Sequence, residues 1–339
     1  MSSTMQTGAP GDADAAEQRS GGSRLAAVRV PLAVLGAVVV AIALVYAVGG
    51  RDAGLVTQSI VTGLLLGGVY ALVSIGLTLI FGVLGIVNFA QGSMLSLSMF
   101  LVYSLVTSVG LPVYVATLVA IPLMFLFGVL VQSLLLNRLT ATGNHDGPLL
   151  VTLGLSLLIV NVLLMVYGGR PLRVPGSVSG SVTVLGAIAS YERLIAFAGA
   201  LLVAVLVTLL LRRTSFGLSI RAVSSNTQGA ALVGVNVRRV YALTFGIGAA
   251  CVAVAGGLLA PILSLTPSVG EQFTILAFVI VVLGGLGSVT GATVGGLVIG
   301  LVQTVGALYL PGTGSLVLVF AVFVLVLFFR PQGMFGAAR

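Results

Sequence analysis

The sequence predicts an all-α, polytopic integral membrane protein with about ten transmembrane helices. Of its 339 residues, 58% are hydrophobic and only 6% are charged, whereas a soluble domain carries about 25% charged residues. The apolar residues form continuous runs of roughly 18–25 residues, the length that an α-helix needs to cross a bilayer. A β-barrel would instead show alternating apolar positions over about ten residues per strand, so a helical bundle is expected.

Residues 1–28 differ in composition from the rest of the chain. They are rich in Gly, Ser, Ala and Asp and contain no apolar run, which predicts a disordered cytoplasmic tail. A cleaved signal peptide is the alternative. The following apolar run, 30–48, is longer than a usual signal-peptide core and lacks a clear cleavage site. We therefore expect a tail over 1–28 and a transmembrane domain over 29–339.

The transmembrane spans are delimited by Arg, Pro, Gly or Asn residues between apolar runs. The predicted ranges are 31–49, 56–80, 83–108, 113–137, 149–168, 194–211, 240–262, 273–288, 291–310 and 314–329. The glycine-rich stretch 284–291 leaves two possibilities open. It is either a cytoplasmic turn between two spans or a break inside the bilayer.

The distribution of arginine predicts the orientation. With ten spans and a cytoplasmic N-terminus, the C-terminus is also cytoplasmic. Eleven arginines then lie inside: Arg19, Arg24, Arg29, Arg138, Arg212, Arg213, Arg221, Arg238, Arg239, Arg330 and Arg339. Four lie outside: Arg51, Arg170, Arg173 and Arg193. This asymmetry obeys the positive-inside rule and predicts a multi-pass protein of a cell membrane, surrounded by lipid. Because loop arginines account for the net charge of +8, no nucleic acid partner is expected.

Missing residue types exclude several mechanisms. The chain contains no lysine, so it has no GxxxxGK[ST] phosphate-binding loop, and any ATP must be bound by another chain. One cysteine, Cys251, and one histidine, His145, exclude an internal disulfide and a Cys-based or two-histidine metal site. We expect no catalytic residue, no metal and no cofactor in this chain. The acidic residues all fall in the tail, in loops or at span ends, which argues against proton coupling.

Polar residues interrupt an apolar run near residue 90. Amide side chains are costly in hydrocarbon unless they face a partner or water. We therefore expect that a translocation path is lined by Asn88, Gln91, Ser93 and Ser96. Hydrogen bonding between helices is the alternative. Close helix packing or gating is expected at Gly85, Gly92, Gly284, Gly287, Gly291 and Gly295.

The predicted cytoplasmic loop 212–239 has five arginines and no acidic residue. Asn226 is an N-cap candidate, 227–233 can form two helical turns, and Gly234 suits a left-handed C-cap. One interpretation is a short helix that docks on an ATPase subunit, and the alternative is a loop that only sets topology. The residues expected to couple to the ATPase are Arg221, Ala222, Asn226, Ala230, Ala231 and Gly234.

Four segments, in order along the chain, resemble the permeases of branched-chain amino acid ABC importers. They are GVLGIVNFAQG at 82–92, the Arg-Ala, Asn, Ala-Ala and Gly-Val-Asn pattern at 221–236, VLGGLGS at 282–288 with Gly291 and Gly295, and RPQGMFG at 330–336. The chain is most similar to the H-type permease subunit of the high-affinity leucine, isoleucine and valine system. Together the segments extend over most of the chain, but the Gly/Ser/Asp-rich start lies outside the resemblance.

The resemblance implies a permease subunit that works in a complex. Its partners would be a second related permease, two ATPase subunits that bind ATP, and an extracytoplasmic substrate-binding protein. Permeases for urea and short-chain amides are similar enough to leave the substrate open. Two readings from other classes are a stand-alone secondary transporter or facilitator and a structural membrane protein.

Overall fold

A computed structural model describes residues 53–335, except 138–145, 176–177, 179, 185 and 311. The predicted tail, the predicted span 31–49 and His145 lie outside the described residues. The helices are α2 (Ala53–Leu84), α3 (Gln91–Val109), α4 (Val113–Val131), continued by the π-helical turn η1 (Gln132–Leu136), α6 (Asp146–Tyr167), α7 (Tyr191–Arg213), α8 (Ser215–Ser225), α9 (Thr227–Leu232), α10 (Val237–Leu259), α11 (Glu271–Gly284), α12 (Val289–Tyr309) and α13 (Gly314–Phe329). Two strands, β1 (Ser181–Val184) and β2 (Ala187–Ser190), form an antiparallel hairpin.

The all-α membrane fold is confirmed, but the number of ten spans is not. Nine of the ten predicted ranges coincide with helices. Among the described residues, seven helices are long and apolar enough to cross a membrane, while α11 and α13 are shorter apolar helices. The first predicted span falls outside the described residues, so it adds nothing to this number.

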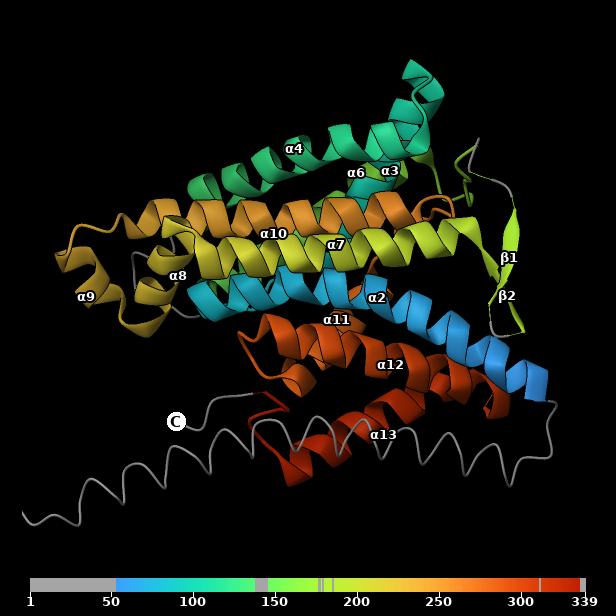
Figure 1. The fold of residues 1–339 in the computed structure, drawn as a ribbon. Helices are drawn as coiled ribbons and strands as arrows, with labels where there is room; N and C mark the ends of the chain where they lie inside the picture. The colour runs from blue at the N-terminus through green and yellow to red at the C-terminus, as the bar shows by residue number, and fades with distance from the viewer. Residues whose placement is uncertain are drawn as a thin grey trace, which may run out of the picture.

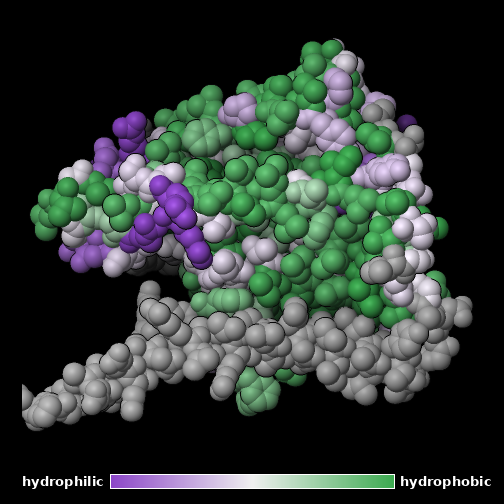
Figure 2. Space-filling model, in the orientation of Figure 1, coloured by the Kyte–Doolittle hydropathy of each residue, from purple (hydrophilic) through white to green (hydrophobic). Residues whose placement is uncertain are grey.

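The helices form one elongated bundle with two distinct ends (Figure 1). The helices α8 and α9 lie at one end, here called the α9 end, and the β1–β2 hairpin lies at the other, the hairpin end. Most of α2 and α10 is buried, whereas α6 and α7 expose most of their length. Figure 2 shows the resulting hydrophobic surface along the bundle, with hydrophilic side chains gathered around α8 and α9.

Glycine brings α2 and α12 into close backbone contact. A Cβ atom on Gly300 would lie 2.4 Å from the carbonyl oxygen of Gly63, and one on Gly296 would lie 2.5 Å from the Cα of Ala71. The paired residue numbers run in opposite directions, so the two helices are antiparallel. Small residues that let helix backbones approach are typical of interfaces inside membranes.

The chain is not helical over 85–90, between α2 and α3. Gly85 ends α2 with φ +69°, a conformation that costs glycine little. Thr152 of α6 holds the segment: its Oγ1 accepts a hydrogen bond from the Phe89 backbone N–H at 3.3 Å. The predicted span 83–108 therefore began eight residues too early, because 85–90 is apolar enough to resemble part of a helix.

The open question about 284–291 is resolved in favour of a turn. Residues 285–288 connect α11 to α12 as an antiparallel pair, with Gly287 beside Gly82 near the last residues of α2. The C-terminal segment closes over this turn, because the backbone N–H of Met334 donates to the Leu283 carbonyl at 2.8 Å. The turn therefore lies at the α9 end of the bundle, not in its middle.

Candidate functional site

Two helices begin side by side inside the bundle, at the first turns of α3 and α11. A Cβ atom on Gly92 would lie 1.9 Å from the carbonyl oxygen of Gly270, so these backbones are in direct contact. The Gly92 N–H donates to Thr274 Oγ1 at 3.0 Å, and the Gly270 N–H donates to Ser96 Oγ at 2.9 Å. We call this contact, residues 88–96 with 270–274, the junction.

The junction lies near the middle of the bundle, between the α9 end and the hairpin end. Gln91 Nε2 donates to the Val73 carbonyl at 3.1 Å, and a Cβ on Gly76 would lie 2.8 Å from both Gln91 Nε2 and the carbonyl oxygen of Gly248. Gly248 is the middle residue of α10. From this depth α3 runs toward the hairpin end and α11 toward the α9 end. Helices broken at the membrane midplane are a feature of many transporter binding sites.

All four residues predicted to line a path lie in α3 or the segment before it, at the junction. Asn88, Gln91, Ser93 and Ser96 are at most 1% exposed. Asn88 Nδ2 donates to Gln91 Oε1 at 3.1 Å, and Asn88 Oδ1 accepts from the Ala90 N–H at 3.1 Å. Ser93 Oγ donates to the Ala90 carbonyl at 3.0 Å. In this conformation these side chains therefore hold the junction together through bonds within the chain.

The six predicted glycines have different surroundings. Gly92 forms the junction, and Gly284 and Gly291 press against each other, since a Cβ on Gly291 would lie 2.1 Å from the Gly284 carbonyl oxygen. Gly295 lies against α11 with less crowding. Gly287 has φ +84°, and Gly85 has φ +69° with nothing within 4 Å of a Cβ. Close packing therefore explains glycine at four positions, and backbone conformation explains it at Gly85 and Gly287.

The predicted short helix after Asn226 is confirmed. It is α9, and Asn226 Oδ1 caps it by accepting a hydrogen bond from the Gly229 N–H at 2.8 Å. Gly234 follows with φ +88°. Sequence reasoning missed α8, which precedes α9 and is capped by Thr214. The spacing of Phe216, Ile220 and Val223 was a helical signal that could have revealed it.

The α8–α9 segment is packed onto the bundle. Ala230, only 4% exposed, belongs to a buried cluster with Val83 of α2, Val240 of α10, and Ile220 and Val223 of α8. Ala222 packs at its edge, whereas Arg221, Ala231, Asn226 and Gly234 are exposed. Ala230 therefore holds α9 against the bundle and does not present a surface to a partner.

Two apolar residues missed by sequence reasoning project from this end. Leu232 is 89% exposed and Val233 is 79% exposed, at the last turn of α9. The five arginines of 212–239 lie in the same segment. Exposed apolar residues in a basic surface are typical of a protein contact site. The signal in the sequence was the Leu-Val pair between two small residues, Ala231 and Gly234.

A cleft of about 750 Å³ separates this segment from the C-terminal residues. It is bounded by the end of α2, by Ser224, Thr227 and Tyr241, by the α11–α12 turn, and by Pro331 and Gln332. The ends of α2 and α11 and the segment α8–α9 thus meet around one space. Because α8 and α9 pack against Val83 at the end of α2, a displacement of α8–α9 would act directly on α2.

Glu271 lies at a helix end, as the sequence predicts, but this helix end is at the junction. Glu271 is the first residue of α11. Because α11 starts at the junction, this carboxylate lies near the middle of the bundle, between its two ends. Hydropathy does not reveal the position of Glu271 along the bundle, because that position depends on how residues 260–270 enter the bundle. Glu271 therefore stands at a helix end, as expected, but that helix end lies inside the bundle.

No group of three or more His, Cys, Asp or Glu side chains with metal-binding geometry occurs in the described part of the chain. Apart from the carboxylate of Glu271, the polar atoms of the junction are amides, hydroxyls and backbone groups, a set that suits neutral hydrogen bonding more than metal ligation.

Comparisons with known proteins identify the family. The family described as "Branched-chain amino acid transport system / permease component" matches residues 59–327. The high-affinity branched-chain amino acid transport system permease protein BraD of Pseudomonas aeruginosa is 32% identical over 293 residues, covering 82% of this chain and 95% of that protein. The corresponding LivH proteins of Salmonella typhimurium and Escherichia coli are 29% and 28% identical, with the same coverage. No solved structure matches. The chain therefore belongs to the permease component family of branched-chain amino acid transport systems.

Proposed function

We propose that this chain is a permease subunit of an ABC importer that moves branched-chain amino acids across a bacterial inner membrane. The relatives named above carry this function in their names. The structural observation that supports it is the packing of α8–α9 onto Val83 of α2, the helix that leads into the junction. A stand-alone carrier has no need of such a segment, and none of the relatives described above is named for urea or amides. Uptake by the reconstituted complex, described at the end of the Discussion, is the test.

The proposed complex contains a second related permease, two ATPase subunits that bind ATP, and an extracytoplasmic binding protein. The translocation path runs between the two permeases, and the junction forms part of its wall. Asn88, Gln91, Ser93 and Ser96 support that wall and line the path where it opens during the cycle. Residues 212–239 contact an ATPase subunit, with Leu232 and Val233 as its apolar contacts and arginines around them.

Loss of the Asn88 amide should impair transport. Asn88→Leu leaves the Ala90 N–H and Gln91 Oε1 without their partner, and an unsatisfied buried polar group costs about 1–3 kcal/mol. We expect leucine uptake by the complex to fall at least fivefold while the ATPase subunits still co-purify. Asn161→Leu is the matched control, because Asn161 is exposed and donates only to the carbonyl of Leu157. Equal uptake by the two variants would assign Asn88 to packing alone.

The proposed topology has both termini and α8–α9 in the cytoplasm. In a Cys251→Ala background, a cysteine replacing Phe335 should react with an impermeant thiol reagent from the cytoplasmic side only. A cysteine replacing Val178, which is exposed near the hairpin, should react from the outside only. Reversed labelling at both positions would contradict the orientation.

A further inference from the structure

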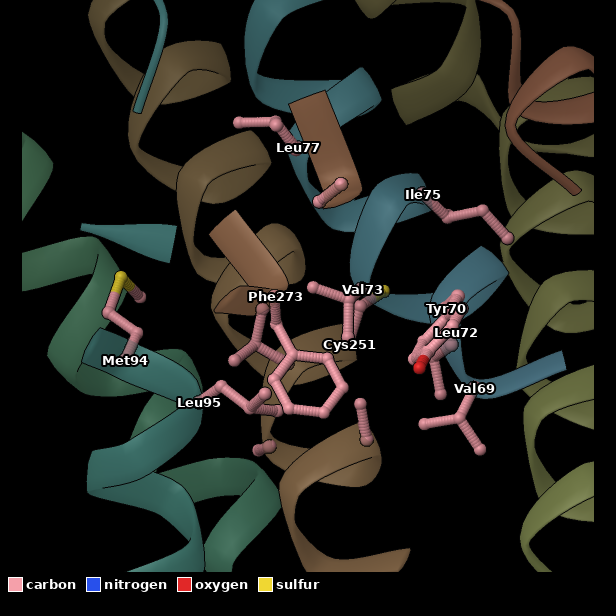
Figure 3. Close-up of a cluster of buried hydrophobic side chains, with 14 of the residues drawn as sticks. Val69, Tyr70, Leu72, Val73, Ile75, Leu77, Met94, Leu95, Cys251 and Phe273 are labelled. Atoms are coloured by element: carbon pink, nitrogen blue, oxygen red, sulfur yellow. The ribbon is translucent and has the colours of Figure 1, made fainter. Parts of the chain in front are cut away.

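The first turn of α11 is anchored in the core by Phe273. Its ring packs edge-to-face against Tyr70, with centroids 5.7 Å apart, and Tyr70 lies near the middle of α2. Figure 3 shows Phe273 in the centre of side chains that include Leu95 of α3 and Val73 of α2. Together with the contact between Gly270 and Gly92, this fixes the depth at which α11 begins.

Glu271 points away from that core. It precedes Phe273 by two residues, which is about 200° around a helix of 3.6 residues per turn. Ile275 follows Glu271 by four residues and Phe278 follows Ile275 by three, so all three residues share one face. All three are exposed in this chain. One face of α11, starting with a carboxylate, is therefore left uncovered by the described residues of its own subunit.

A carboxylate near the middle of the bundle would face lipid only at a large cost in free energy. Insertion scales give about 2.5–3.5 kcal/mol for such a residue at the centre of a membrane helix. The outward face of α6 shows the lipid-compatible alternative, with Leu157, Val162 and Met165 exposed. Within the described part of the chain, Glu271 is the charged side chain that lies between the two ends of the bundle, and no described residue forms a salt bridge with it. In the assembly this carboxylate is therefore expected to face water, a cation, a polar ligand or a polar group of the second permease.

We propose that Glu271 lines the translocation path and that its carboxylate binds the α-ammonium group of the passing amino acid. This inference rests on the proposed function, which supplies a zwitterion with an apolar side chain. Glu271 offers the complementary charge, and the neighbouring exposed amide of Gln272 offers a donor for the substrate carboxylate. Ile275 and Phe278, further along the same face, offer apolar contact for a branched side chain. One ionic contact opposite an otherwise uncharged wall orients the substrate and still permits its release.

The site also refines the sequence-based view of an uncharged path. Asn88, Gln91, Ser93 and Ser96 are all satisfied within the chain at the junction, so none has a free polar atom for substrate in this conformation. Glu271 belongs to the same junction and is exposed. It is thus the polar group that a substrate meets without the junction first having to open.

Two measurements on the assembled complex test the proposal. Glu271→Gln, which keeps shape and removes charge, should lower leucine uptake at least tenfold below saturation while the ATPase subunits still co-purify, and Glu271→Asp should retain more uptake than Glu271→Gln. In a Cys251→Ala background, a cysteine at position 271 should react with a water-soluble thiosulfonate at least ten times faster than one replacing Met165, which is 86% exposed on α6.

Each outcome tests a separate part of the proposal. Normal uptake by Glu271→Gln would overturn the ammonium site. Reactivity at 271 no faster than at 165 would overturn the path assignment and place Glu271 against lipid or a residue of the second permease. If the wild-type complex takes up no leucine, the proposed function fails and the ammonium ligand with it. Cysteine reactivity still decides independently whether position 271 lines a water-filled path.

Discussion

Gly92→Ala should abolish transport, although it adds a single methyl group. The new Cβ would lie 1.9 Å from the Gly270 carbonyl oxygen and 2.2 Å from Thr274 Oγ1, and the carbonyl belongs to a backbone that has no rotamer to change. Overpacking a well-packed interior costs about 1–3 kcal/mol and occasionally more. Separating α3 from α11 also breaks the hydrogen bonds of Thr274 and Ser96 across the junction. We expect at least a hundredfold loss of uptake and a lower thermal midpoint of the purified complex.

Gly154→Ala is the matched control for this variant. Gly154 lies inside α6, and a Cβ there would meet nothing within 4 Å. Alanine is favoured over glycine in a helix interior by about 1 kcal/mol, so this variant should keep wild-type uptake and an unchanged or higher midpoint. If Gly92→Ala behaves like Gly154→Ala, the close contact between the two helix starts does not govern transport.

The double variant Leu232→Asp, Val233→Asp should detach the ATPase subunits from the permease. Full burial of an apolar side chain of this size is worth about 1.5–3 kcal/mol, and each 1.4 kcal/mol changes an affinity about tenfold. Losing both contacts therefore predicts an affinity at least a hundredfold weaker, measured by co-purification and by substrate-stimulated ATP hydrolysis. The fold should survive, because both side chains are exposed in this chain.

Val109→Asp provides the control for that double variant. Val109 is 63% exposed and ends α3 next to Gly110, at the opposite end of the bundle. It should leave co-purification and stimulated hydrolysis unchanged. If the double variant binds the ATPase as well as this control does, the tip of α9 is not the contact and 212–239 serves only to set topology.

Hydropathy and local chemistry predicted much of the fold. The apolar runs that became α4, α6 and α7 were found because lipid-facing helices are apolar throughout. The start of α9 was found because Asn226 and Gly234 are local signals for helix ends. The hairpin was missed. Its two-residue connection contains Gly186, with φ +82°, but the strands have only four residues each, too few for a clear alternating pattern.

The candidate site was predicted only in part. The sequence drew attention to Asn88 and Gln91, because amides are rare in apolar runs. Gln91 donates to the distant Val73 carbonyl, and the neighbouring Gly92 N–H donates to the distant Thr274. These long-range contacts follow from packing. Ala230 was expected to fit a partner, yet it packs on Val83 and Val240. An Ala230→Arg variant would therefore disrupt this buried cluster, so its effect would not measure ATPase docking alone. The depth of Glu271 depends on how 260–270 enters the bundle, which no local pattern reveals.

Leucine uptake by the reconstituted complex distinguishes an ATP-driven permease subunit from a stand-alone carrier. The chain would be co-expressed with its second permease and ATPase subunits, purified as a complex and placed in liposomes, with ATP supplied on the ATPase side and binding protein on the other. Leucine uptake is expected to require both ATP and the binding protein. Equal leucine uptake by liposomes that contain this chain alone, without ATP, would contradict this expectation.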